Sequence, residues 1–75
     1  MLLRMEQRTT SPLYETRVRG DLGETLLSAF PALRGRAQDG TTVLLGRLPD
    51  QAALHGVLGQ IASLGLDLLA VRRVG

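Results

Sequence analysis

The stretch that decides the fold is residues 50–74, which read DQAALHGVLGQIASLGLDLLAVRRV. The pattern predicts a capped amphipathic helix that runs directly into an apolar strand. Asp50 is placed to cap this helix, because its side-chain oxygen can accept a backbone N–H of the first turn. Gly65 suits the position just after the helix, which often adopts a positive φ. Apolar residues at helical spacing form the expected core stripe, namely Leu54, Val57, Leu58, Ile61 and Leu64.

Residues 66–74 predict the last strand of a sheet. Side chains alternate between the two faces of a strand, so Leu69 and Val71 are expected to face the helices. The residues expected on the opposite face are Leu68, Ala70 and Arg72.

A β-hairpin is predicted upstream, with arms at residues 33–38 and 41–46. Asp39-Gly40 lies between them, and a type I′ turn needs positive φ at both of its central positions. The resulting register puts Leu33, Gly35, Ala37, Thr42 and Leu44 on one face. The other face carries Arg34, Arg36, Val43 and Leu45.

The N-terminal half predicts one strand and one short helix. Residues 13–19 alternate, with Tyr14, Thr16 and Val18 expected to point inward. Asp21 is expected to cap the helix, with Glu24 completing a capping box, and Pro31 stops it. The apolar face of this helix would comprise Leu22, Leu26, Leu27 and Phe30.

The element order is therefore β-α-β-β-α-β with short connections. Two right-handed crossovers around one hairpin predict an α+β sandwich with the ferredoxin-like fold. Its antiparallel four-stranded sheet has the order 4-1-3-2, and both helices cover one face. Residues 12–75 form this single domain, and residues 1–11 are expected to be a flexible tail, with Met5 as an alternative start.

Composition excludes several classes of function. The chain has 75 residues and no cysteine, which excludes a CxxC redox centre, a thiolate metal site and a cysteine nucleophile. All nine basic residues are arginine, a bias that we attribute to a GC-rich bacterial genome. No apolar run is long enough for a bilayer or a signal peptide, so we expect a cytoplasmic protein.

Catalytic chemistry is not indicated either. His55 is the single histidine, and no acid lies one helical turn away to help it bind a metal. The acids at positions 15, 24, 50 and 67 do not form a recognisable acid–base pair. Phosphate-binding glycine motifs are missing as well. We therefore expect a non-catalytic domain without metal or cofactor.

The sheet face away from the helices is the predicted interface. Apolar residues ringed by arginines are typical of a protein contact whose charged groups lie outside a dry centre. We expect a homodimer, or a complex with another protein, through this face. The residues predicted to form it are Leu13, Arg17, Arg36, Val43, Leu45, Leu68, Ala70 and Arg72.

The outer face of the second helix is another candidate contact. Small residues there would let a partner backbone approach closely, although they are equally consistent with neutral choices on a solvated face. They are Ala52, Gly56, Gly59 and Ser63. Specific nucleic-acid binding is not expected, because Tyr14 and Phe30 are placed away from the sheet face where bases would stack.

Two resemblances add to this interpretation. Residues 18–23 with 26–28, and residues 61–71, resemble parts of ACT domains, which are βαββαβ modules that bind small ligands, often amino acids, between paired subunits. This likeness implies ligand binding as the alternative function. The whole of residues 13–74 is similar to small bacterial proteins of uncharacterised activity, through Tyr14-Glu15, Arg17-Val18, residues 50–56, Leu64-Gly65-Leu66 and Val71-Arg72-Arg73. That likeness implies the fold alone.

Overall fold

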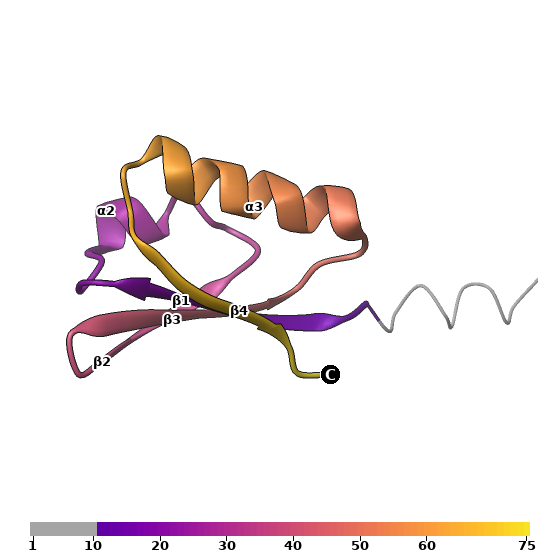
Figure 1. Cartoon of the computed structure of the whole chain (residues 1–75), viewed down its shortest axis with the longest axis horizontal. Helices are drawn as coiled ribbons and strands as arrows, with labels where there is room; N and C mark the ends of the chain where they lie inside the picture. Colours follow the sequence, from indigo (N-terminus) through magenta and orange to yellow (C-terminus); the bar gives the residue numbers. More distant parts are fainter. Residues whose placement is uncertain (1–10) are drawn as a thin grey trace, which may run out of the picture.

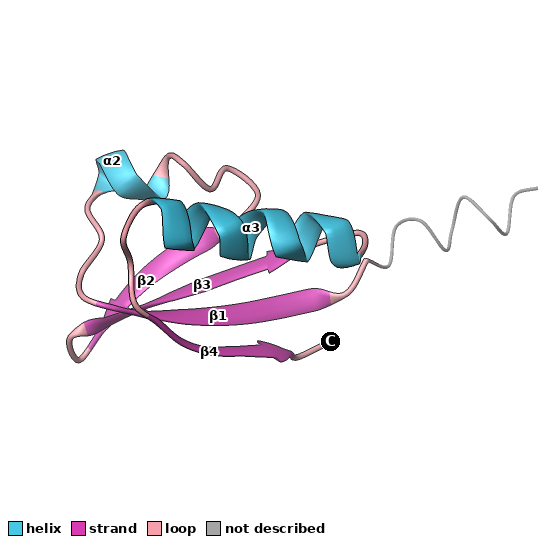
Figure 2. Cartoon of the chain, turned by 45° about the horizontal axis from the view of Figure 1, so that its top comes forward, coloured by secondary structure: helices cyan, strands magenta, loops and turns pink. Residues whose placement is uncertain are grey.

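The computed structural model describes residues 11–75, so most of the predicted tail at residues 1–11 lies outside it. Four antiparallel strands form one sheet in the order β2-β3-β1-β4, and two helices lie over the same face of that sheet (Figures 1 and 2). This is the predicted order read from the opposite edge. The elements are β1 (Leu13–Arg19), α2 (Glu24–Leu27), β2 (Arg34–Gln38), β3 (Thr41–Arg47), α3 (Gln51–Ser63) and β4 (Leu68–Arg73).

The central strand β1 confirms the predicted alternation. Tyr14, Thr16 and Val18 are buried under the helices, whereas Arg17 and Arg19 are exposed on the other side. β1 pairs antiparallel with β3 on one side and with β4 on the other. β1 and β3 are therefore the two central strands, and both contribute buried residues to the core under the helices.

The hairpin between β2 and β3 also forms as predicted. Asp39 and Gly40 have φ values of 51° and 80°, as a type I′ turn requires. Gln38 pairs with Thr41, and the register continues along both strands as expected from a two-residue loop. The turn therefore fixes which side chains of β2 and β3 face the helices.

The core lies between the sheet and the helices in two adjoining clusters. The first contains Val18, Leu22, Phe30, Leu44 and Ile61. The second contains Tyr14, Leu48 and Leu54. Val57 and Leu58 of α3 pack against both clusters, so this helix joins them.

The predicted cap of the first helix is wrong. The helix begins at Glu24 with Gly23 as its N-cap, and no side chain caps it. The chain before it is held by Thr42 of β3, whose hydroxyl accepts the Leu22 N–H at 3.1 Å and donates to the Gly20 carbonyl at 2.7 Å. These bonds carry Leu22 into the core and start the helix later than a cap at Asp21 would.

The second helix begins and ends as predicted, with Asp50 as its N-cap and Gly65 directly after its C-cap. The Ala53 N–H donates to Asp50 Oδ1 at 2.9 Å, and Gly65 follows the helix with a φ of 75°. Leu54 and Ile61 are buried, and Val57 and Leu58 between them pack against the core, which confirms the stripe from Leu54 to Ile61. Leu64 is 40% exposed, so its predicted place in that stripe is wrong. Leu64 is the C-cap residue, so it lies beyond the last residue of the helix, whereas Ile61 in the last turn is buried.

The last strand follows the predicted alternation from Ala70 to Arg72 but departs from it at its start. Its register with β1 shifts between Arg17 and Val18, so that Arg17 pairs with Ala70 and Val18 pairs with Leu68. Leu69 falls in this irregularity and is 41% exposed, so its predicted burial under the helices is wrong. An extra residue of this kind is a β-bulge, which disrupts the two-residue alternation of side chains.

Two glycines differ in how much space surrounds them, and this difference can be tested by measuring stability. A Cβ on Gly46 would collide with the backbone of Ala32 and with Leu33, whereas one on Gly56 would meet nothing. We expect Gly46→Ala to lower the free energy of unfolding by about 1–3 kcal/mol, because a backbone atom cannot move aside easily. Gly56→Ala should raise it by about 1 kcal/mol, since alanine favours the helix interior.

Urea unfolding of both variants and the parent chain measures the two changes. An undiminished stability for Gly46→Ala would contradict the close contact between β3 and the segment before β2.

Candidate interaction surface on the open sheet face

The sheet face away from the helices is uncovered (Figures 1 and 2). We call it the open face and define it by the strand register, in which residues directly opposite one another share a face. Its central residues are Glu15 and Arg17 of β1, Arg34 and Arg36 of β2, Val43 and Leu45 of β3, and Ala70 and Arg72 of β4. Leu13 lies at one end of the same face, opposite Arg47.

Two rows of side chains cross the centre of the open face. In one row, Leu45 lies between Arg34 and Glu15. In the next row, Val43 lies between Arg36 and Arg17. The two apolar side chains are therefore neighbours on β3, with arginines on both adjacent strands.

Some charges on this side of the molecule are already paired. Arg72 Nε donates to Glu15 Oε1 at 3.0 Å, and Arg19 Nε lies 3.5 Å from Asp67 Oδ2. Such exposed pairs contribute little to stability, but they neutralise each other's charge. Glu15, the carboxylate in the centre of the open face, is therefore compensated within the chain.

The remaining arginines of the open face have no such partner. Within residues 11–75, the central Arg17, Arg34 and Arg36 form no ion pair, and Arg47 at the end of the face donates only to the Ser11 carbonyl. The three central arginines flank Val43 and Leu45 on the adjacent strands, so the centre of this surface carries uncompensated positive charge. Arg73 is also without an ion pair to a described residue, but it lies opposite the buried Tyr14 and thus on the helix side of the sheet.

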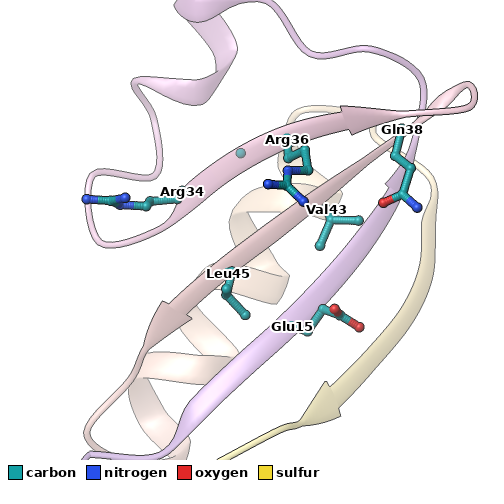
Figure 3. A pocket seen from close by; sticks show the side chains of 7 residues that line it. Glu15, Arg34, Arg36, Gln38, Val43 and Leu45 are labelled. Carbon is teal, nitrogen blue, oxygen red and sulfur yellow. The ribbon is translucent and has the colours of Figure 1, made fainter.

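A shallow hollow of about 470 Å³ lies over β3 on this face. Arg36 leans across β3 beside Val43, whereas Arg34 extends away from Leu45 (Figure 3). Glu15 marks the opposite side of the hollow (Figure 3). The residues that line it are Glu15, Arg34, Gly35, Arg36, Gln38, Val43 and Leu45.

Most of the predicted interface residues lie on the same face in the structure. The exposed apolar area among them is smaller than predicted. Leu45 is 38% exposed, while Val43 and Leu13 are half-buried. Leu68 pairs with the inward-facing Val18, so the register does not place it in the open-face set. The apolar centre is therefore one exposed leucine with Val43 beside it, set among charges.

Gln38 was not among the interface residues predicted from sequence. It lines the hollow together with Arg34 and Arg36, at the same two-residue spacing on β2. The alternation of the strand was the signal that could have identified it, because residues two apart share a face.

The other predicted contact, the outer face of α3, is solvent-exposed. Its small residues are Ala52, Gly56, Gly59 and Ser63, and a Cβ on either glycine would meet no other group. His55 is exposed beside them, and residues 11–75 contain no cluster of three or more potential metal ligands. No helix in the described part of the chain is long and apolar enough to cross a membrane.

The fold and this surface define a small α+β domain with an uncovered, arginine-bearing sheet face. Residues 13–72 match the model of a family described as "Domain of unknown function (DUF8691)", and the chain belongs to that family. The match runs from the start of β1 almost to the end of β4. Comparison with curated proteins and with solved structures gave no match.

Proposed function

We propose that this protein is a non-catalytic interaction module of the bacterial cytoplasm, built on the ferredoxin-like arrangement, that binds protein through its open face. The observation that carries the proposal is the pair Val43 and Leu45 on an uncovered strand, with Arg17, Arg34 and Arg36 around it. An apolar centre inside a polar rim is the common anatomy of a protein interface. Arginine is also among the residues enriched at such interfaces.

The partner is either a second copy of this chain or another protein, and salt dependence separates the two. Two open faces in contact would bring the arginines of both copies together, so added salt would strengthen that dimer by screening their repulsion. A partner of opposite charge would instead bind more weakly as salt rises.

Leu45→Glu is the variant that tests the open face. It would place a charge in the centre of the interface, and we expect it to abolish association without loss of structure, since Leu45 is already 38% exposed. Leu64→Glu is the matched control, because Leu64 is 40% exposed and belongs to the helix layer. Light scattering at low and high salt, with circular dichroism for the fold, makes the comparison.

A dimer that persists in Leu45→Glu, or that Leu64→Glu dissociates instead, would contradict the open face as the interface. A monomeric parent chain would exclude the second copy and leave a different protein as the partner.

Small-ligand binding is a second candidate function, favoured by the hollow beside Arg36. A carboxylate ligand such as an amino acid could accept hydrogen bonds from that guanidinium group. A ligand that binds only the native state raises the unfolding temperature, so an amino-acid panel should yield at least one thermal shift that Arg36→Gln removes. A panel without any shift would count against this function.

A further inference from the structure

The chemistry of the open face narrows the class of partner. The three arginines around Val43 and Leu45 that form no ion pair within residues 11–75 come from two strands, with Arg17 on β1 and Arg34 and Arg36 on β2. We infer that the open face binds an acidic protein segment that also presents an apolar side chain. This inference rests on the proposed function and specifies its partner.

The arginines of β2 set a spacing that an extended segment can match. Arg34 and Arg36 are two positions apart on a strand, which corresponds to about 6.6–6.8 Å along the chain. Carboxylates two residues apart on an extended partner have the same separation. Charge-assisted pairs of guanidinium and carboxylate groups are shorter and stronger than neutral hydrogen bonds. Arg36, which leans over β3 in Figure 3, is the principal contact of this arrangement.

The floor of the hollow explains why the partner needs an apolar side chain as well. Val43 and Leu45 lie between the arginine-bearing strands and would be covered by such a side chain. Gln38 lies at the end of the same row of β2 side chains and offers both a donor and an acceptor to the partner's backbone.

Protein is favoured over nucleic acid as the source of negative charge. Sheets that bind single-stranded RNA stack bases on aromatic rings of their exposed face. The two aromatic residues of this chain, Tyr14 and Phe30, are both buried in the core. The open face therefore has no aromatic ring on which a base could stack, but it has an apolar surface that a partner's apolar side chain could contact.

A second copy is the less suitable occupant. Each open face carries Arg17, Arg34 and Arg36 without a compensating carboxylate, and Glu15 is already engaged by Arg72. Two such faces would oppose like charges, which destabilises an interface by electrostatic repulsion. An acidic partner converts the same charges into attraction.

The test uses a labelled peptide of seven alternating glutamates and leucines, which matches the seven residues of β3. Fluorescence anisotropy with the whole chain should show binding that weakens as salt is added. Arg36→Gln should weaken it by about tenfold or more, because hydrogen bonds to charged groups contribute more than neutral ones. Arg73→Gln removes the same charge from the helix side of the sheet and should leave the affinity almost unchanged.

Three further comparisons can overturn the inference. Equal binding of a peptide with glutamine in place of glutamate would show that acidity is not recognised. Equal losses in Arg36→Gln and Arg73→Gln would reveal only general charge attraction. Tighter binding of a single-stranded oligonucleotide, with the same dependence on Arg36, would assign the surface to nucleic acid.

Leu45→Gln separates this inference from the proposed function. If Leu45→Gln abolishes peptide binding and Arg36→Gln does not, the open face still binds protein. The inference that it recognises acidic residues of the partner is then wrong. If neither variant changes binding, or if the acidic peptide does not bind at all, the inference fails. Retained dimerisation that depends on Leu45 would then still support the proposed function.

Discussion

The hydroxyl of Thr42 is the interaction on which the arrangement of the layers depends. Thr42 is 1% exposed, and its Oγ1 bonds both the Leu22 N–H and the Gly20 carbonyl. These two bonds turn the chain from the end of β1 onto the helix side of the sheet. A buried polar group that loses its partner costs about 1–3 kcal/mol, so the turn is firmly specified. Because the chain crosses to this side here and again at Asp50, both helices cover one face and leave the other open.

Local sequence signals predicted the elements that local interactions decide. The Asp39-Gly40 turn, the Asp50 cap and the alternation of residues 13–19 each involve residues close together in the chain, and all three are confirmed. The Asp21 cap failed because Thr42, twenty residues away from Leu22, binds the Leu22 N–H before the helix begins, and the helix starts only at Glu24. Leu69 failed because a bulge depends on how two strands pair, which one strand's own sequence does not reveal.

The candidate site shows the same contrast between features set by nearby residues and features set by contacts between distant ones. Alternation and the hairpin register were enough to predict that Arg17, Arg36, Val43 and Leu45 share a face. They could not predict which arginines are compensated, because the Glu15–Arg72 pair joins strands that are far apart in sequence. That pair decides which charges on the open face remain for a partner. The apolar area was overestimated for a related reason, since neighbouring side chains cover most of Val43 and Leu13.

The arginines of β2 are consistent with two compatible roles, protection of the sheet edge and the proposed recognition of a partner. β2 is an edge strand with every residue exposed, and charges on such a strand discourage pairing with the edges of other molecules. Both arginines border the hollow, and the Arg36 side chain points toward β3 on the open face. Negative and positive charges would protect the edge equally well. Recognition of an acidic segment, by contrast, requires positive charge at these positions. The outer face of α3, by contrast, presents small uncharged residues and no comparable chemistry.

The most direct test of the account is to locate the binding surface residue by residue. Amide resonances of the isotope-labelled chain would be followed by two-dimensional NMR during titration with the alternating glutamate–leucine peptide. We expect the shifts to be concentrated in β2 and β3, including Arg36, Val43 and Leu45, while the resonances of α3 remain unchanged. Shifts confined to the outer face of α3, at Gly56 and Gly59, would contradict the claim that the open sheet face is the functional surface.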